Sequence, residues 1–432
     1  MNYACGMIAP TSSSRRIHPA WIVLGAMTLC MATASGIRAV FGVYVKPLEA
    51  EFGWSRGAIS GVAALSLLLL GAVGPLAGRL ADRWGPRRVT LLAVVLLGGG
   101  AIGASAIQTL WQAYLTTGIV MGIGSGGLGL ATGSVIAARW FESRRGLAIG
   151  IAAGGMSAGQ LVVIPVATAL MLWFGWRVSF LALGLGLLGI ALPIAFWLIR
   201  DDPADRGMSA YGATGPALSA AQTKRARTTG RVGLVEAAQH AQFWLLAVTS
   251  FVCGYTSVGL ILTHFVPHAL EHNFSQVEAT TALAIMGSMN VVGTLGSGWL
   301  CDRFGRRGPL ATYYLIRGLS LVFLLYVWNA PSLHLWAAIF GLNWVSTVPP
   351  TTTLTASIFG RYSVGELSGW IYFAHQVGAA LSAATAGWIF EAFGSYTPAF
   401  VSAALLALFA AALTMLIREE PVISRPMAPV PI

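Results

Sequence analysis

Long apolar stretches alternate with short polar connections along almost the whole chain. Twelve of these stretches can each supply about twenty apolar residues, the number that crosses the hydrocarbon core of a bilayer as a helix. We therefore predict an all-α membrane protein with twelve transmembrane helices, near residues 19–45, 58–78, 89–108, 111–138, 146–172, 177–199, 242–268, 277–298, 309–328, 333–357, 366–390 and 396–417.

The polar connections carry an uneven distribution of positive charge. If the N-terminus is placed in the cytoplasm, 21 of the 26 lysines and arginines lie on the cytoplasmic side, three lie in outer loops, and two lie inside spans. This is the positive-inside pattern, so both termini are predicted to be cytoplasmic. The net charge of +11 is then a consequence of topology, and no nucleic-acid partner is expected.

One connection is much longer than the others. Residues 201–240 begin with acidic positions, continue with Gly, Ser, Ala and Thr, and end in a basic cluster of Lys224, Arg225, Arg227 and Arg231. We interpret this segment as a flexible cytoplasmic linker, and its basic cluster as a charge signal for cytoplasmic retention rather than a lipid-binding site. The resulting organisation is a cytoplasmic tail (1–18), a six-helix bundle (19–200), the linker (201–240), a second six-helix bundle (241–417) and a cytoplasmic tail (418–432).

Composition supports a membrane location. Charged residues make up 9% of the chain and apolar residues 56%, and 52 of the 432 residues are glycine, which allows close helix packing in lipid. The first apolar stretch is too long for a cleaved signal peptide and is predicted to be a signal anchor. The four cysteines predict neither a disulfide nor a metal site, because no outward-facing pair is present.

Two charged hairpins show that the chain is built from two similar halves. Residues 78–88 read GRLADRWGPRR and residues 298–307 read GWLCDRFGRR, with their aspartates 220 positions apart. A second pair of similar segments begins at Phe141 and at Phe359, 218 positions later. Repeats of this kind indicate two pseudo-symmetric bundles with a cavity between them near the middle of the bilayer.

The residue types in each hairpin have distinct physical roles. Glycine lets the end of one helix lie against a neighbour, and arginine keeps the connection in the cytoplasm. Aspartate can either form charge-assisted bonds or cap the N-terminus of a helix in the opposite half. The candidate gating residues are Gly78, Asp82, Arg83, Gly85 and Arg87 in the first hairpin and Gly298, Asp302, Arg303, Gly305 and Arg306 in the second.

The hairpins resemble the G-x-L-a-D-R-x-G-R-R signature of the major facilitator superfamily. This resemblance implies transport by alternating access, with the hairpins latching the cytoplasmic side in the outward-open state. The alternative is that they are simple topological anchors. Three further stretches, residues 43–56, 144–155 and 370–378, are similar to the monocarboxylate-porter and oxalate/formate-antiporter branch, especially its bacterial members.

The fifth span differs from the drug/proton antiporters of the superfamily, which carry a Gly-Pro-x-x-Gly-Gly pattern there. In this chain Pro165 stands six residues after Gly159 and no Gly-Pro pair is present in the span. A drug or hydrophobic-metabolite exporter is therefore the second hypothesis, and a transporter-like sensor is the third.

Charged residues inside the spans indicate the substrate class. All fifteen acidic residues can be placed in loops or at span ends, whereas Arg38 and Arg317 lie within spans. A cavity with arginine and no deep carboxylate is electropositive and favours an anionic substrate. We predict that Arg38 binds the substrate through its planar guanidinium, and that Arg317 has a structural role with backbone carbonyls or nearby tyrosines.

Other polar span residues are candidates for the cavity wall. His375 is expected either to bind an anion or carry a proton, or to join helices as a neutral residue, and Gln376 and Tyr372 lie beside it. The eighth span has Asn290 and Thr294 where animal monocarboxylate transporters carry an Asp and an Arg, which argues against their proton-coupling mechanism. The remaining candidates are His264 and Asn343.

The sequence therefore predicts a secondary transporter of a small organic anion in the inner membrane, with a monocarboxylate as the expected cargo. Symport, antiport and uniport stay open. No catalytic motif is present, so no enzyme activity, cofactor or metal is expected. The expected partners are the small-molecule substrate and the lipid bilayer, and the chain is expected to be monomeric.

Overall fold

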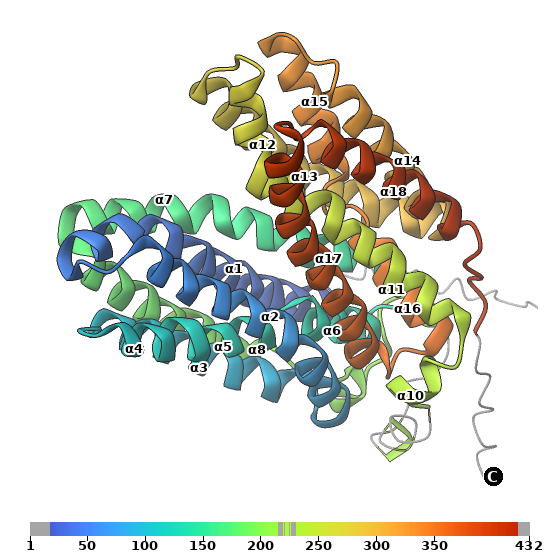
Figure 1. The fold of residues 1–432 in the computed structure, drawn as a ribbon. Coiled ribbons are helices and arrows are strands. Elements are labelled where there is room, and N and C mark those ends of the chain that lie inside the picture. Colours follow the sequence, from blue (N-terminus) through green and yellow to red (C-terminus); the bar gives the residue numbers. More distant parts are fainter. Residues whose placement is uncertain (1–17, 215–218, 220, 224, 226–229, 422–432) are drawn as a thin grey trace, which may run out of the picture.

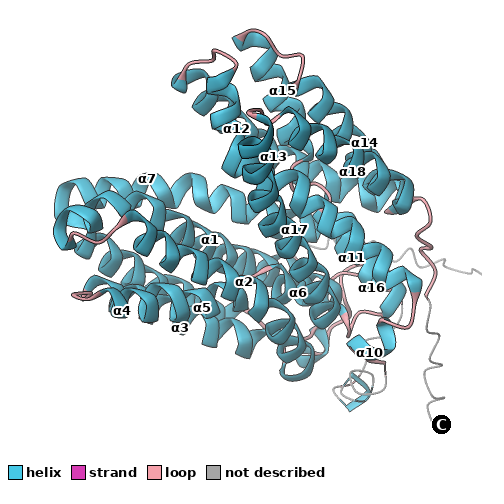
Figure 2. Cartoon of the chain, viewed as in Figure 1, coloured by secondary structure: helices cyan, strands magenta, loops and turns pink. Residues whose placement is uncertain are grey.

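The computed structural model describes residues 18–214, 219, 221–223, 225 and 230–421. The described part is helical throughout, with loops between the helices and a single isolated bridge between Phe141 and Tyr211 (Figure 2). The predicted N-terminal tail, except His18, and residues 422–432 of the C-terminal tail lie outside the described residues, as do Lys224 and Arg227 of the linker.

The N-terminal half contains six spans. Three are single helices, and the fourth and sixth are continued through short π-helical turns, η1 and η2. The elements are α1 (Pro19–Phe52), α2 (Arg56–Trp84), α3 (Pro86–Ser105), α4 (Leu110–Ala113), η1 (Tyr114–Val120), α5 (Met121–Gly127), α6 (Leu130–Trp140), α7 (Arg145–Gly186), η2 (Leu187–Ala191) and α8 (Leu192–Leu198).

The C-terminal half repeats this order after the linker, which contributes the 3-10 turn η3 (Pro203–Arg206) and α10 (Leu234–Ala237). Its elements are α11 (Ala241–Gly254), η4 (Tyr255–Gly259), α12 (Leu260–Glu271), α13 (Gln276–Phe304), α14 (Arg307–Leu324), α15 (Ala330–Asn343), α16 (Val348–Phe359), α17 (Val364–Phe393) and α18 (Thr397–Thr414).

Eight helices in the described residues are long and apolar enough to cross a membrane. One of them, Arg145–Leu198, contains two of the predicted spans, joined at Gly175, whose φ of 84° breaks the helix. The other three predicted spans are α14, α15 with α16, and α17. Polar residues lower the hydropathy of two of them, because α14 carries Arg317 and α17 carries His375 and Gln376. The third is divided into α15 and α16, which have 14 and 12 residues and are each too short to cross alone.

Helix starts follow the local sequence at the outer loops. The side chain of Ser55 accepts a hydrogen bond from the amide of Ala58 at 3.2 Å, which caps α2. Ser275 and Glu278 form a reciprocal capping box at the start of α13. Such caps satisfy amides that have no partner within the helix and set the ends of the outer loops.

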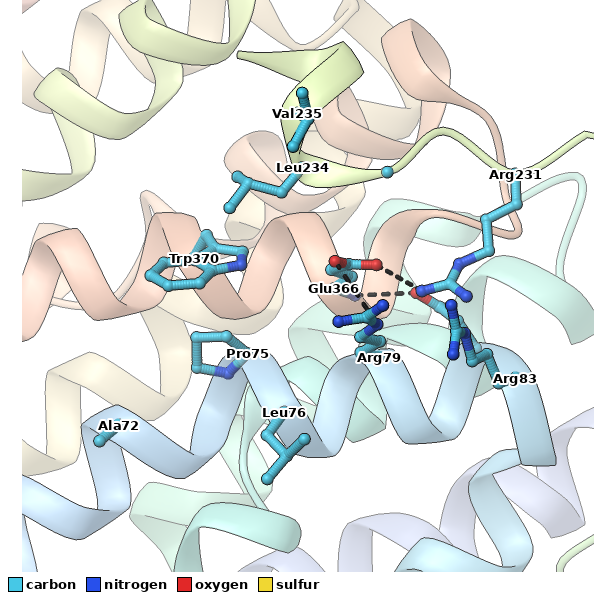
Figure 3. A pocket seen from close by; sticks show the side chains of 12 residues that line it. Ala72, Pro75, Leu76, Arg79, Arg83, Arg231, Leu234, Val235, Glu366 and Trp370 are labelled. Atoms are coloured by element: carbon cyan, nitrogen blue, oxygen red, sulfur yellow. Dashed lines mark hydrogen bonds and ion pairs between the residues drawn. The ribbon is translucent and has the colours of Figure 1, made fainter.

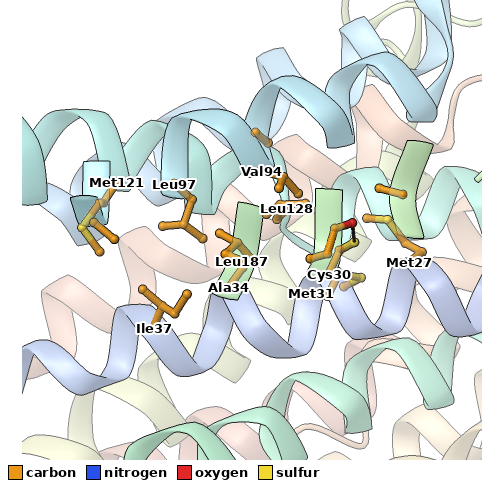
Figure 4. Close-up of a cluster of buried hydrophobic side chains, with 14 of the residues drawn as sticks. Met27, Cys30, Met31, Ala34, Ile37, Val94, Leu97, Met121, Leu128 and Leu187 are labelled. Carbon is orange, nitrogen blue, oxygen red and sulfur yellow. Dashed lines mark hydrogen bonds between the residues drawn. The ribbon is translucent and has the colours of Figure 1, made fainter. Parts of the chain in front are cut away.

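The N-terminal half has a continuous apolar core of side chains from α1, α3, α5 and the sixth span. Figure 4 shows that Met31, Ile37, Val94, Leu97 and Leu187 meet in this cluster, and all five are at most 3% exposed. Close packing of this kind holds each half as a unit.

The two halves meet at one end and separate toward the other. In Figure 1 their ribbons lie together near the linker and diverge toward the ends that hold the α1–α2 and α12–α13 loops. The contacts between the halves come from α2, α6 and α7 on one side and α13, α16 and α17 on the other. Since the linker side is cytoplasmic by its charge, the halves are joined at their cytoplasmic ends.

Candidate functional site

Asp82, near the end of α2, caps a helix of the opposite half. Its carboxylate accepts hydrogen bonds from the backbone amides of Gly365 at 3.2 Å and Glu366 at 2.8 Å, at the start of α17. It is 1% exposed, and Arg139 of α6 covers it by donating to the carbonyl oxygens of Ala81 and of Asp82 itself. A carboxylate at a helix N-terminus is stabilised both by these bonds and by the helix dipole.

Asp302 makes the symmetry-related contact. Its two oxygens accept from the amides of Gly146 at 2.7 Å and Leu147 at 2.8 Å, at the start of α7. Unlike Asp82 it is exposed, because Ser357 occupies the position that corresponds to Arg139 and bonds to the carbonyl of Thr353 in its own helix. The two capping contacts therefore have the same geometry and different burial.

Glycine pairs lie directly beside both capping contacts. A methyl group on Gly78 would overlap the carbonyl oxygen of Gly365, and one on Gly298 would overlap that of Gly146. The reverse substitutions at Gly365 and Gly146 meet the same obstruction. Only residues without a side chain allow the backbones of opposite halves to approach this closely.

A second acidic residue fixes each hairpin to its own half, which the sequence analysis missed. Asp201 accepts from the amide of Arg87 at 2.9 Å, and Glu419 accepts from the amides of Arg306 at 3.0 Å and Arg307 at 2.8 Å. These acids lie 218 positions apart, just after the last span of each half, and that matched spacing was the available signal. Burial by itself raises the pKa of Glu419, but the hydrogen bonds from Arg307 and Arg306 outweigh burial and hold this pKa below its usual value.

The remaining hairpin residues shape the loops. Gly85 and Gly305 have φ of 97° and 81°, values that favour glycine. The side chain of Arg87 donates to the carbonyl of Phe196 at 2.7 Å and lies over its ring, and Arg306 pairs with Glu419. Arg303 lies over the rings of Trp299 and Phe304, and Arg83 is exposed.

The described part of the linker packs against the bundles. Arg231 forms an ion pair with Glu366, which also lies 4.0 Å from Arg79, and the amide of Val232 donates to Ser363 at 2.7 Å. Arg79, Arg83, Arg231 and Glu366 line a cytoplasmic cavity of about 770 Å³, in which the three arginines converge around the glutamate (Figure 3). Arg231 is thus part of the contact at the start of α17 as well as of the basic cluster.

Arg38 lies farther from the cytoplasmic ends, in a cavity of about 200 Å³ formed by α1, α2 and the fourth span. Phe41, Ser60 and Ser66 are among the other residues that line it. The guanidinium is half-buried, and no hydrogen bond or ion pair joins it to another residue that the structure describes. It interacts electrostatically with the hydroxyl of Tyr372, which belongs to α17 of the opposite half.

Tyr372, His375 and Gln376 form one group on α17. The rings of Tyr372 and His375 stack with centroids 5.4 Å apart, and His375 Nδ1 lies 3.0 Å from Gln376 Oε1. Tyr372 and His375 line a cavity of about 40 Å³, to which Leu130 of the N-terminal half also contributes. Arg38 lines a different cavity, and its link to this group is the electrostatic interaction with Tyr372.

The other three predicted binding residues are engaged elsewhere. Asn290 donates to Ser157 at 2.8 Å and accepts from the amide of Val345 at 3.1 Å, so its side chain joins α7, α13 and the α15–α16 break. His264 lies 2.9 Å from the carbonyl oxygen of Ala383 and packs on Tyr396. Neither residue lines the cavities that hold Arg38 and His375.

Asn343 is bound to a buried arginine. Arg317 donates to the Asn343 side chain at 3.2 Å, to the Asn343 carbonyl at 2.6 Å and to the Trp344 carbonyl at 2.7 Å. These carbonyls are free because the helix is interrupted between α15 and α16. The geometry is that of a structural arginine, and the sequence analysis missed its fourth partner, Cys253, at 3.0 Å.

Comparison with known proteins identifies the family. The family model described as Major Facilitator Superfamily matches residues 27–383, with a second match at residues 298–428. The chain belongs to the major facilitator superfamily. The predicted fold of twelve helices in two six-helix bundles is thereby confirmed, and the protein is a multi-pass membrane transporter rather than an enzyme.

Similar members of the superfamily include bacterial and animal transporters. The chain is 26% identical to the uncharacterized MFS-type transporter YcxA of Bacillus subtilis (strain 168) over 378 residues, which covers 86% of this chain and 88% of YcxA. It is 24% identical to mouse (Mus musculus) monocarboxylate transporter 12 over 429 residues, with 95% and 88% covered. The predicted resemblance to monocarboxylate porters is confirmed at this level.

A solved structure shares the fold. The major facilitator superfamily proton:xylose symporter XylE, bound to 6-bromo-6-deoxy-D-glucose, superimposes with a TM-score of 0.70 at 17% identity, and the match covers 93% of this chain and 97% of XylE. Within the described residues no group of three or more His, Cys, Asp or Glu side chains could hold a metal ion.

Substitution of each hairpin aspartate should change hydrogen–deuterium exchange at one helix start and leave the other unchanged. Asp302→Asn removes the charge that holds the amides of Gly146 and Leu147, so exchange at the start of α7 should rise by about tenfold or more. Asp82→Asn should do the same for Gly365 and Glu366 at the start of α17. Each variant is the control for the other, and equal protection of both helix starts in both variants would contradict the capping role.

Proposed function

We propose that this chain transports a small organic anion, a monocarboxylate in the first instance, across the bacterial inner membrane by alternating access. The observation that carries the proposal is Arg38. It is a half-buried cation that lines a cavity in the N-terminal half, without a carboxylate partner among the described residues, and it interacts electrostatically with Tyr372 of the C-terminal half. A cation held in this way favours an anion as its occupant.

The chemistry of the neighbouring side chains fits a carboxylate. A guanidinium presents parallel N–H groups that bind both oxygens of a carboxylate. Tyr372 and Gln376 supply a hydroxyl and an amide from the opposite half, and both can donate hydrogen bonds. An anion bound between Arg38 and α17 would contact both halves and would therefore be able to draw them together.

The hairpin contacts supply the other part of the cycle. In this arrangement Asp82 and Asp302 hold the cytoplasmic ends together while the halves diverge at their outer ends (Figure 1). We propose that this is an outward-facing state and that release to the cytoplasm breaks both capping contacts. The predicted gating role of Gly78, Gly298 and the hairpin arginines belongs to the same proposal.

The name of one relative agrees with the proposed cargo. Mouse monocarboxylate transporter 12 aligns over 95% of this chain. The proposed anion site nevertheless does not use the eighth span, because Asn290 and Thr294 are uncharged and their side chains are hydrogen-bonded within the protein. We also propose that the working unit is the monomer, since one chain supplies both walls of the site.

Uptake into proteoliposomes tests the proposal. Purified protein should take up radiolabelled acetate, lactate or benzoate and should not take up glucose, with protein-free liposomes as the blank. Dicarboxylates such as succinate should compete weakly, because Arg38 is the one arginine among the residues that line the cavity and it can pair with one carboxylate. Efflux of uncharged aromatic compounds without any carboxylate uptake would overturn the proposal and would favour the exporter hypothesis.

A further inference from the structure

Arg317 is a buried cation that needs a counter-charge. Its side chain is 0% exposed, and a guanidinium does not lose its proton in a protein. Three of its hydrogen bonds go to the neutral oxygens of Asn343 and Trp344, and within the described part of the chain no aspartate or glutamate pairs with it. An isolated charge in such a place is strongly unfavourable.

The sulfur of Cys253 is the acidic group in contact with this cation. Arg317 Nη1 lies 3.0 Å from Cys253 Sγ, and the hydroxyl of Thr347 lies 3.1 Å from the same atom. His375 lines the same cavity as this sulfur. An adjacent arginine and additional hydrogen-bond partners favour the thiolate form of a cysteine.

The ring of His375 is held by two neighbours on α17. Its Nδ1 lies 3.0 Å from Gln376 Oε1, an amide oxygen that can only accept, so Nδ1 carries the hydrogen. This leaves Nε2 as the ring nitrogen that can accept a proton. Stacking on Tyr372 keeps the ring in this orientation.

The other ionisable groups near the sulfur are accounted for. The hydroxyl of Tyr314 donates to the carbonyl of Thr249 at 2.5 Å, and that of Tyr372 interacts electrostatically with Arg38. The helices α16 and α18, which also pack against α11, contain no ionisable side chain. Sγ of Cys253 and Nε2 of His375 are therefore the proton-accepting atoms of this cluster.

A small polar cavity borders the pair. The cavity of about 40 Å³ is lined by Cys253, Tyr372, His375 and Ser368, among others. Ser368 is 9% exposed, and its buried hydroxyl has no hydrogen-bond partner among the described residues. A cavity of this size and polarity can hold water, which would give a proton access to the pair.

We propose that Cys253 and His375 form a proton-binding site that takes up one proton for each carboxylate bound at Arg38. With Cys253 as thiolate and His375 neutral, Cys253 and Arg317 cancel in charge. A hydronium ion from the outer solution then gives its proton to Sγ or Nε2 and leaves as water, with no change of oxidation state, so the site gains one positive charge. The bound carboxylate brings one negative charge, so proton and anion enter the low-dielectric interior as a neutral pair.

The proton site rests on the proposed anion transport. The test therefore measures anion transport and its coupling to protons separately. In proteoliposomes, uptake of labelled carboxylate driven by an inward proton gradient is compared with self-exchange of the same carboxylate at equal pH. The ratio of the two rates should fall by about fivefold or more in Cys253→Ser and in His375→Asn. Misfolding lowers both rates together and does not change their ratio.

Cys30→Ser and Cys301→Ser are matched controls, because both thiols are buried and neither has a hydrogen bond from an arginine side chain in the described structure. Both should keep the wild-type ratio. A wild-type ratio in Cys253→Ser and His375→Asn would overturn the proton site and leave anion transport intact. Absence of carboxylate transport in the wild type would instead overturn the proposed function.

The ionisation of Cys253 gives a second measurement that does not depend on transport. Detergent-purified protein should show the ultraviolet absorption band of a thiolate at about neutral pH. Cys253→Ser should lose this band, while Cys30→Ser and Cys301→Ser retain it. A band of equal intensity in Cys253→Ser, or no band in the wild type, would overturn the thiolate assignment.

Discussion

Arg38→Gln should lower carboxylate uptake by about 10- to 100-fold while the protein stays folded. The substitution keeps a hydrogen-bonding side chain of similar reach but removes the charge and the parallel N–H groups. A hydrogen bond to a charged partner is worth about 1.5–3 kcal/mol, and this energy sets the size of the loss. The effect on folding should be small, because the guanidinium makes no hydrogen bond or ion pair to other described residues.

The measurement is initial uptake of the best labelled carboxylate in proteoliposomes, with circular dichroism and thermal unfolding as folding checks. Arg38→Lys keeps the charge and should retain part of the uptake. Arg177→Gln is the matched control, because Arg177 lies in α7 two residues after the break at Gly175 and pairs with Glu51, and an exposed ion pair of this kind contributes little. Wild-type uptake in Arg38→Gln would remove Arg38 from the anion site.

Gly298→Ala should open the cytoplasmic side. The added methyl group overlaps the backbone of Gly146, which cannot move aside as a flexible side chain can, so the closed arrangement is destabilised relative to the open one. Overpacking of this kind costs about 1–3 kcal/mol, which corresponds to a population shift of about 5- to 150-fold. Because transport needs both states, net uptake should fall as well.

Cys301 is a natural reporter for this change. It is 3% exposed and lies at the contact between α13 and the start of α7, next to Gly146. In inside-out vesicles its modification by a membrane-impermeant maleimide, followed by mass spectrometry, should accelerate in Gly298→Ala. Gly296→Ala is the matched control two residues away on α13, where a methyl group meets open space. Equal modification rates in the two variants would contradict the role of the glycine crossing in closure.

Only part of the contact between the two halves could be predicted from the repeated hairpins. The types and spacing of Asp82 and Asp302 predicted capping of a helix in the opposite half, because a carboxylate beside a helix N-terminus is a local and general preference. The partner glycines, Gly146 and Gly365, could not be selected from the many glycines of the chain. Their role depends on the close approach of two backbones, and the hydropathy of the sequence does not indicate where such an approach occurs.

The buried arginine shows the same division. The sequence indicated that Arg317 lies inside a span and would need backbone carbonyls or tyrosines. The break between α15 and α16, which frees those carbonyls, is not apparent in an apolar stretch, and the contact with Cys253 joins residues 64 positions apart. Asn290, Asn343 and His264 carried the expected polarity for a cavity wall, and packing used that polarity between helices instead.

The sequence by itself determined the membrane environment, the number of spans, the orientation and the two-half repeat. These properties follow from hydropathy, positive charge and local spacing, which act along the chain and need no knowledge of distant contacts. Only the tertiary structure decided which distant residues meet: Cys253 with Arg317, Cys253 with His375 in one cavity lining, and each glycine with its partner. Helices of similar composition can pack in many rotations, and the rotation chosen by side-chain fit determines whether a polar residue lines a cavity or joins two helices.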